Sequence, residues 1–365
     1  MNIISLPEYP CTFDMWDRLK AETRPIVVYG MGNGADKLIR RFEGYGITIS
    51  DFFASDGFVR GHFFHGMRVK SFSEIKEKYV DFVIVLSFAS NREEVIEMLS
   101  KIDEKHTMFV PDMPVALEEE YFDKYFYNQN YTQIKSAYEA LADIESKNIF
   151  ASVVNYKLSG NMKFLLNCYT EKAEMYSLFP CDKIKKIIDA GAYNGDTLKE
   201  AKKYFLGLEE AVAIEPDKKN FKKLRRYSEA ENSYKIEAIN AAAWSKDGDG
   251  SFLSSGNRNS TLSAQPSYEY KEGLVNLVRI DSVSQGWADY IKYDVEGAEM
   301  EALIGSRLTI EQSKPSLLVS VYHKSRDIFE ITNYLHQTYP SYSIYMRRLR
   351  CLPAWELNLL LIGKG

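Results

Sequence analysis

Short apolar segments alternate with amphipathic segments along the first third of the chain, and this alternation predicts strands separated by helices. The apolar segments are PIVVYG (25–30), ITISDFFASD (47–56) and DFVIVLSF (81–88), and helical patterns follow at 71–79 and 91–102. Strands that are joined by helices normally lie parallel in one sheet. Residues 1–112 are therefore predicted to form a small α/β domain whose parallel sheet has about four or five strands.

The pattern changes twice after this domain. Residues 113–182 are rich in Glu, Tyr and Lys, as in QIKSAYEALADIESKNIF (133–150), and they predict a helical connector without strands. Alternation then resumes over 183–365, which predicts a second, larger α/β domain with helices on both faces of the sheet and between its first five strands. Its seven expected strands lie at 186–191, 211–216, 234–244, 290–296, 317–322, 342–348 and 356–363.

Composition limits the partners and the cellular compartment. The 365 residues include 46 Lys and Arg against 51 Asp and Glu, and the net charge of -5 argues against nucleic acid as a partner. The first 20 residues do not resemble a signal peptide and no window holds 18 apolar residues, so we expect a cytoplasmic protein without membrane insertion. Whether the chain forms a homo-oligomer is left open by these patterns.

The clearest chemical motif is the turn IIDAGAYNGDT (187–197). An apolar strand ends at Asp189, and Gly191, Ala192 and Gly195 allow a close backbone approach to a ligand before a helix begins. One strand-helix-strand unit later, AIEPD ends a second strand at Glu215, where a carboxylate can accept hydrogen bonds from both hydroxyls of a ribose.

The charge of this turn distinguishes between cofactors. The motif reads D-x-G-x-x-x-G, and a carboxylate at its start would repel the pyrophosphate of a dinucleotide. The same carboxylate would suit a ligand with a cationic amino acid end. S-adenosyl-L-methionine combines a ribose, an ammonium group and a sulfonium, and it has no phosphate.

Several segments resemble the FkbM family of S-adenosylmethionine-dependent methyltransferases. These are DAGAYNGD (189–196), NAAAWSKDGDG (240–250) and above all YIKYDVEGAEMEALIG (290–305), and the resemblance extends from about residue 140 to the end. It implies a class I methyltransferase-type, seven-stranded Rossmann-like sheet. It also implies O-methylation of a sugar or natural-product hydroxyl, for which we expect a carbohydrate or a glycosylated small-molecule acceptor in the biosynthesis of a bacterial surface polysaccharide.

The resemblance also implies which residues hold the cofactor. The turn would bind the methionine end, Glu215 and Pro216 would face the ribose, and Ala242 and Ala243 would contact adenine, unless these two alanines serve ordinary packing. The turn residues in question are Asp189, Gly191, Ala192, Tyr193, Asn194, Gly195 and Asp196.

Methyl transfer to a hydroxyl requires alignment of the acceptor and a group that removes its proton. The candidates at the carboxyl ends of the central strands are Asp294, Glu296 and His323. Asp294 is the favoured active-site residue, with a helix cap as its alternative role. His323 has a suitable ordinary pKa of about 6.5, and a hydrogen-bonded structural role is equally compatible with its position. Lys292 would neutralise the carboxylates.

A metal ion is an alternative that we do not favour. Asp281, Asp294 and Glu296 could together bind Mg²⁺, which prefers oxygen ligands. The insertion GNRNSTLSA (256–264) contains Ser260, Thr261 and Ser263, which could line an acceptor pocket, although a solvated loop is the simpler interpretation. The basic run RRLR (347–350) could meet the phosphate of an activated sugar, although a solvated strand edge is the commoner role.

The N-terminal domain carries a second nucleotide-type motif. Gly30, Gly32 and Ala35 form G-x-G-x-x-A after a strand, and Asp51 or Asp56 could serve as its ribose-binding acid. This Rossmann-like domain supports two alternative functions, an NAD(P)-linked oxidoreductase and a nucleotide-sugar-binding protein. A vestigial or partner-binding domain is the favoured interpretation, and a noncatalytic protein that retains the cofactor pocket is a further alternative.

Overall fold

The computed structural model describes residues 3–113, 120–254, 261–262 and 271–364. These residues form two compact units that exchange segments along the chain. The first unit contains residues 1–138, 147–169 and 348–356, and the second contains 139–146, 170–347 and 357–365. The domain boundaries predicted at 112 and 182 remain a proposal. Among the described residues, no helix has both the length and the apolar character needed to cross a bilayer.

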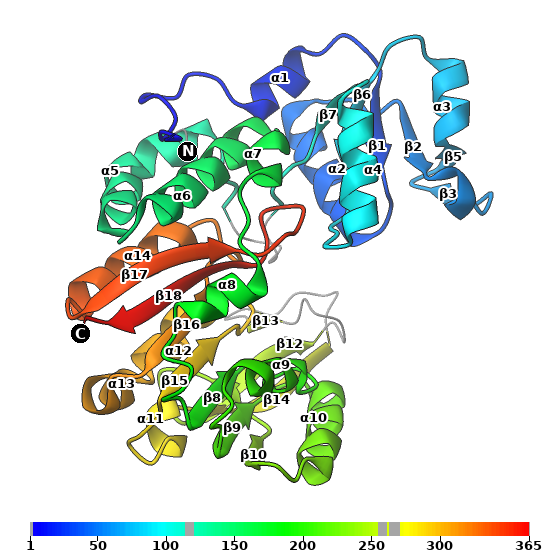
Figure 1. Cartoon of the computed structure of the whole chain (residues 1–365). Coiled ribbons are helices and arrows are strands. Elements are labelled where there is room, and N and C mark those ends of the chain that lie inside the picture. The colour runs from blue at the N-terminus through cyan, green and yellow to red at the C-terminus, as the bar shows by residue number, and fades with distance from the viewer. Residues whose placement is uncertain (1–2, 114–119, 255–260, 263–270, 365) are drawn as a thin grey trace. The chain divides into compact units, whose positions relative to one another are not determined.

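The first unit is built on a five-stranded parallel sheet with the order β5-β2-β1-β6-β7 (Figure 1). Its central strands have no exposed face, which explains why their sequences are continuously apolar instead of alternating. The strands are β1 (Ile26–Tyr29), β2 (Asp51–Ala54), β5 (Lys70–Ser71), β6 (Val83–Leu86) and β7 (Thr107–Phe109), and a separate hairpin joins β3 (Phe63–Phe64) to β4 (Met67–Arg68). The helices are α1 (Met15–Ala21), α2 (Asn33–Tyr45), η1 (Asp56–Phe58), α3 (Phe72–Lys78), α4 (Glu93–Asp103), α5 (Lys124–Ala140), α6 (Ile144–Ser159) and α7 (Lys163–Leu166).

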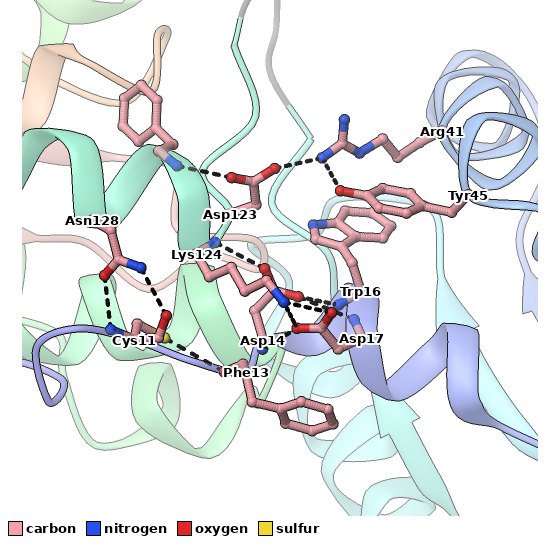
Figure 2. A network of polar contacts seen from close by, with 11 residues as sticks. Cys11, Phe13, Asp14, Trp16, Asp17, Arg41, Tyr45, Asp123, Lys124 and Asn128 are labelled. Atoms are coloured by element: carbon pink, nitrogen blue, oxygen red, sulfur yellow. Dashed lines mark hydrogen bonds and ion pairs between the residues drawn. The ribbon is translucent and has the colours of Figure 1, made fainter.

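Side-chain contacts fix the start of α5 to the helices that precede it (Figure 2). Asp14 caps α1, and its second carboxylate oxygen accepts from the Lys124 backbone amide at 2.8 Å. The Lys124 ammonium lies 2.7 Å from a carboxylate oxygen of Asp17. Arg41 of α2 donates to Asp123 at 2.9 Å. The first helix of the predicted connector is therefore part of the first unit for most of its length.

The second unit contains the predicted seven-stranded sheet, with the order β10-β9-β8-β15-β16-β18-β17 (Figure 1). The sheet is parallel from β10 to β16, and β18 joins β16 antiparallel. Its strands are β8 (Lys186–Ala190), β9 (Glu210–Ile214), β10 (Lys235–Ile239), β15 (Tyr290–Tyr293), β16 (Ser316–Ser320), β17 (Tyr342–Arg348) and β18 (Leu357–Gly363). The helices are α8 (Lys172–Ser177), α9 (Asp196–Tyr204), α10 (Lys218–Ala230), α11 (Ile280–Val283), α12 (Glu299–Ile304), α13 (Arg307–Ser313) and α14 (Asp327–Thr338). The predicted α/β class and the seven strands of this sheet are confirmed.

Two expectations for this unit were wrong. The segment 234–244 is not one strand, because it is interrupted after Ile239 and resumes as β11 (Ala242–Ala243) in a second sheet. That four-stranded sheet, β11-β14-β12-β13, also holds β12 (Gly248–Ser254), β13 (Thr261–Leu262) and β14 (Lys271–Val278). The connection from the third to the fourth strand of the large sheet is therefore mainly β structure and not a simple helix.

The first two residues of the basic run 347–350 are buried, so they do not lie on a solvated strand edge. Arg348 is 1% exposed and belongs to the first unit, where its guanidinium donates to the backbone carbonyls of Leu165, Cys168 and Cys351. Burial lowers the pKa of Arg348, and no carboxylate accepts from it among the contacts of the described residues. This side chain therefore satisfies three main-chain acceptors that are buried around it.

We expect Arg348→Met to lower the free energy of unfolding by about 3 kcal/mol, because three buried carbonyls would lose their donor. Urea denaturation followed by fluorescence would measure the change. Arg350→Met is the matched control, since Arg350 is partly exposed and paired with Glu93, and its loss should cost less than about 1 kcal/mol. Equal stability of the two variants would contradict the assignment.

Candidate functional site

The predicted methionine-end residues begin with Asp189 near the carboxyl end of β8 and continue into the turn that follows it. Asp189 is 3% exposed, and one of its carboxylate oxygens accepts from the Thr197 hydroxyl. The other oxygen, Oδ1, is buried and has no hydrogen-bond partner, although the Lys292 ammonium lies 3.5 Å away. Burial raises the pKa of Asp189, and Lys292 opposes that rise. An unsatisfied buried acceptor beside a glycine turn fits a ligand that carries a cationic donor.

The two glycines of this turn serve the packing of the protein itself. Gly191 has φ +87°, and a Cβ placed on it would lie 1.8 Å from the backbone oxygen of Asp294. Gly195 has φ +85°, and a Cβ there would lie 2.5 Å from the ring of Tyr227. The prediction that these glycines make room for a ligand is therefore incomplete, because protein atoms already occupy both positions.

The rest of the turn is held by main-chain and side-chain hydrogen bonds. The amides of Gly191 and Ala192 donate to the carbonyl of Ile214 in β9. Asn194 accepts from the amide of Asp196, the exposed first residue of α9. Tyr193 adopts φ +48°, which is uncommon for a residue with a side chain. The carboxyl ends of β8 and β9 and the turn thus form one connected structure.

Glu215 lies at the carboxyl end of β9, as predicted, and it is 6% exposed. Its carboxylate accepts from the amides of Tyr193 and Asp217, each at 2.9 Å. Burial raises the pKa of Glu215 to about 7, although these two amides oppose the rise. Glu215 therefore fastens the turn to the second strand in addition to any contact with a ribose. Pro216 follows it and is partly exposed.

The structure separates the two predicted adenine residues from the large sheet. Ala242 and Ala243 are buried in β11, and Ala242 packs with Val275 and Leu277. Asn240 takes the position at the end of β10, and its amide donates to the carbonyls of Glu215 and Pro216 at 2.8 and 3.1 Å. Sequence reasoning missed Asn240, although a polar residue that interrupts the apolar run 238–243 is a visible signal.

Lys292 connects the turn to the predicted catalytic carboxylates. Register pairs Lys292 of β15 with Asp189 of β8, and the buried ammonium lies 3.5 Å from Asp189 Oδ1 and 3.3 Å from Asp294 Oδ2. Burial alone would lower the pKa of Lys292, but Asp294 and Asp189 raise it above its usual range. The ammonium is therefore charged at neutral pH and is shared between one carboxylate at the end of each strand, so one negative charge of the pair is balanced.

Asp294 directly follows β15, and its side chain is 29% exposed. Its Oδ1 accepts from the Tyr322 hydroxyl at 3.3 Å and lies 3.5 Å from His323 Nε2. Burial would raise the pKa of Asp294, but Lys292 and His323 outweigh it and the pKa is lowered. Asp294 is thus an ionised acceptor that remains accessible from outside.

His323 is 2% exposed and lies among several carboxylates. Its Nδ1 is 2.9 Å from Glu299 Oε1, and its Nε2 is 3.5 Å from both Asp294 and Glu296. Burial alone would lower the pKa of His323, but Glu299, Glu296 and Asp294 raise it to about 10. An imidazolium has no free lone pair for a proton. The arrangement therefore favours a charge-balancing role for His323 over the role of a proton acceptor.

Glu296 occupies the turn between β15 and α12 with φ +55°, and its side chain is 30% exposed. Burial raises the pKa of Glu296 to about 8, while His323 opposes the rise. A pKa near neutral suits a residue that takes up and releases a proton. Asp294 and Glu296 therefore present two accessible carboxyl groups of different acidity at one end of the sheet.

Glu299 is a further residue that sequence reasoning missed. It is 0% exposed, and its Oε1 accepts from the amides of Val295 and Gly297 at 2.9 and 3.3 Å. The same oxygen faces His323. Glu299 thus shapes the turn that carries Glu296. The only signal was its place in DVEGAE, where an acidic residue at the start of a helix also has the simpler role of complementing the helix dipole.

In the described part of the chain, no contact connects Asp281 to the carboxylates of Asp294 and Glu296. The three residues of the Mg²⁺ alternative therefore do not form one site. Asp281 of α11 accepts from the backbone amides of Leu308 and Thr309 and from the Thr309 hydroxyl, so it caps α13. Within the described ranges, three residues that could ligate a metal lie close together, namely Asp294, Glu299 and His323. Each offers one ligand atom, and these atoms lie within 4.8 Å of one another. A charged imidazole in that group opposes the binding of a cation.

The suggested acceptor-lining residues are not tested by the structure. Ser260 and Ser263 lie outside the described residues, and Thr261 is the first residue of β13.

Protein atoms fill only part of the space beside the glycine turn of the first unit. A Cβ on Gly30 would lie 2.7 Å from Phe88 and one on Gly34 would lie 1.9 Å from the backbone oxygen of Ser87, whereas no described atom lies within 4 Å of a Cβ on Gly32. Asp51 is buried at the start of β2 and is bound by Lys70, Lys78 and Tyr79. The aspartate is therefore at the wrong end of its strand for a ribose at the glycine turn. Neither alternative function of this unit gains support from these contacts.

Comparison with known families identifies a methyltransferase domain within the second unit. Residues 189–341 match the family model of the methyltransferase FkbM domain. A crystal structure of methyltransferase FkbM from Methylobacillus flagellatus KT has a TM-score of 0.69 and 20% identity, covering 93% of this chain and 90% of that one, which shows a shared fold. No curated protein matches the sequence.

Two further solved structures resemble the chain over about half of its length. An rRNA methylase from Streptococcus thermophilus has a TM-score of 0.36 and 11% identity, and covers 54% of this chain and 98% of its own. Fibrillarin from Aeropyrum pernix, in complex with S-adenosyl-L-methionine, has a TM-score of 0.33 and 10% identity. The match covers 50% of this chain and 69% of the fibrillarin chain.

Proposed function

We propose that this chain, an S-adenosylmethionine-dependent methyltransferase with an FkbM domain at residues 189–341, transfers the methyl group to a sugar hydroxyl. The acceptor would be a glycan or a glycosylated precursor in the cytoplasmic stages of bacterial surface-polysaccharide synthesis. One observation carries the assignment of the reacting end: the Lys292 ammonium lies within 3.5 Å of both Asp189 and Asp294, so it connects the proposed cofactor turn to an ionised, accessible carboxylate.

The residues present fit the cofactor. The unsatisfied Oδ1 of Asp189 would accept a hydrogen bond from the ammonium of the methionine end. The carboxylate of Glu215 would accept hydrogen bonds from the ribose hydroxyls. Bound S-adenosylmethionine supplies the methyl group. Asp294 would accept the hydrogen bond of the acceptor hydroxyl and orient it. Glu296 would take up the proton in its ionised form, in which the raised pKa of about 8 makes it a stronger base than an ordinary carboxylate.

The test of this function is methyl incorporation from labelled S-adenosylmethionine into a panel of neutral and acidic oligosaccharides and nucleotide sugars. A labelled product whose methyl group is on a sugar oxygen is the expected result. Transfer only to nitrogen or carbon atoms would contradict the acceptor assignment. Repeating the assay in EDTA tests the Mg²⁺ alternative, and we expect unchanged activity.

Glu215→Gln should weaken the binding of S-adenosylhomocysteine by about tenfold or more, since a charged acceptor for the ribose and for the amide of Tyr193 is lost. Isothermal titration calorimetry would measure it. Glu209→Gln removes a carboxylate that is 64% exposed near the opposite end of β9, and it is the matched control. Unchanged affinity in both variants would remove Glu215 from the proposed cofactor site.

A further inference from the structure

Helix α10 is strongly basic although the chain as a whole is acidic. Its 13 residues contain six Lys and Arg and a single acidic residue, Glu229, whereas the whole chain has a net charge of -5. All six cationic side chains are exposed: Lys218, Lys219, Lys222, Lys223, Arg225 and Arg226. We name these six residues the α10 basic face. It is a local concentration of charge that the total composition conceals.

Most of these cations have no carboxylate beside them. Within the parts of the chain that the structure describes, Arg225 pairs with Glu229 at 3.4 Å, and no ion pair forms at Lys218, Lys219, Lys222 or Arg226. Basic residues elsewhere in the same unit are commonly paired, as Lys202 with Glu231, Arg279 with Asp247 and Arg307 with Glu311. Like charges four residues apart destabilise a helix, so the α10 basic face has an electrostatic cost that an anionic partner would offset.

The α10 basic face begins at the proposed cofactor site. The helix starts after Asp217, whose amide donates to Glu215 and whose carboxylate caps the helix by accepting from the amides of Lys219 and Asn220. The Lys223 ammonium lies 5.9 Å from the ring centroid of Tyr193 in the glycine turn. Helix α10 packs beside β10 at the edge of the large sheet (Figure 1). A ligand on the first turns of this face would therefore lie next to the carboxyl ends of β8 and β9.

We propose that the α10 basic face binds an anionic saccharide, so that the acceptor carries carboxylate or phosphate groups along its chain. This proposal rests on the proposed sugar O-methylation and specifies its substrate class. Lysine ammonium groups on flexible stems suit a polymer whose charges are not rigidly placed. A one-sign field beside the site would also raise the local concentration of an anionic acceptor and its rate of association.

The test compares two variants that remove the same charge. Lys218→Gln, Lys222→Gln and Arg226→Gln together neutralise one face of α10, since these residues are four positions apart. The control triple is Lys183→Gln, Lys246→Gln and Lys314→Gln, three exposed lysines elsewhere in the second unit. The probes are polygalacturonate, a neutral dextran, a single-stranded RNA oligomer and phosphatidylglycerol vesicles, each titrated at low and at moderate salt.

We expect polygalacturonate to bind the wild type in a salt-dependent way and the α10 triple variant about tenfold or more weakly, while the control triple behaves as the wild type. Dextran should not discriminate between the variants. Equal binding of polygalacturonate by both triples would overturn the proposal. Stronger, α10-dependent binding of RNA or vesicles than of polygalacturonate would also overturn it and assign the face to that partner.

Binding of S-adenosylhomocysteine and methyl transfer to neutral saccharides are measured in parallel. If the proposed function is right and the α10 proposal is wrong, both persist with no preference for acidic acceptors. If no saccharide is methylated although S-adenosylhomocysteine binds, the proposed function fails, whatever the polygalacturonate titration shows. The two failures are therefore distinguishable.

Discussion

Replacing Asp294 by asparagine should lower kcat for methyl transfer by about 100-fold or more, with little change in the affinity for S-adenosylhomocysteine. An amide retains the shape but cannot hold the negative charge that orients the acceptor hydroxyl and stabilises its departing proton. The buried Lys292 and His323 keep this carboxylate ionised in the wild type, so its charge is built into the fold. Initial rates at saturating cofactor would measure the loss.

Asp247→Asn is the matched control, since that carboxylate is 47% exposed and pairs with Arg279 away from the proposed site. Thermal denaturation of both variants would show whether lost activity reflects lost folding, because Asp294→Asn would leave Lys292 and His323 with one carboxylate fewer. A folded Asp294→Asn protein with at least half of the wild-type kcat would remove Asp294 from the reaction. Glu296→Gln would then be the next variant to test as proton acceptor.

The strands were predictable because burial on both faces of a parallel sheet leaves a continuous apolar run, as in IVVY of β1 and VIVL of β6. The second sheet was missed for the opposite reason. Strands β12 and β14, with the sequences GDGSFLS and KEGLVNLV, contain glycine and charged residues that resemble a polar loop. Their pairing is long-range, and a pattern of local sequence does not contain it.

The sequence predicted which residues lie at the strand ends of the candidate site, but it did not predict the contacts between their side chains. The positions of Asp189, Glu215 and Asp294 follow from the rule that ligands lie at the carboxyl ends of parallel strands. The closeness of Lys292 to two carboxylates depends on the register of β15 against β8. Likewise, the acidic neighbours of His323 come from the turn after β15 and from helix α12, so its ordinary pKa does not describe this environment.

The glycines of the turn after β8 are another case in which the sequence predicts a local structure but not its contacts. The sequence DAGAYNG indicates a tight turn, and the positive φ of Gly191 and Gly195 agrees with that. It does not indicate which atoms fill the space beside each glycine. The Asp294 carbonyl and the Tyr227 ring come from residues about 100 and 30 positions away, so only the folded chain shows them.

His323→Gln should change how stability depends on pH. The pKa of His323 rises from 6.5 to about 10 on folding, because nearby Glu299, Glu296 and Asp294 outweigh the effect of burial. A pKa raised on folding gives stability that is complete below pH 6.5 and is lost as the pH increases toward 10. We therefore expect the free energy of unfolding of the wild type to fall by a few kcal/mol, on the order of 2 or more, between pH 6.5 and 10.

Urea denaturation at several pH values would measure this slope, and His323→Gln should reduce it while lowering stability most at pH 6 to 7. Glu296 and Asp327, whose pKa values burial raises to about 8, contribute in the same direction, so part of the slope should remain. His336→Gln is the control, since His336 is exposed on α14. A His323→Gln protein whose slope equals that of this control would show that His323 is neutral in the folded protein. Its imidazole would then be free to accept a proton, and the division of roles between His323, Asp294 and Glu296 would have to be reversed.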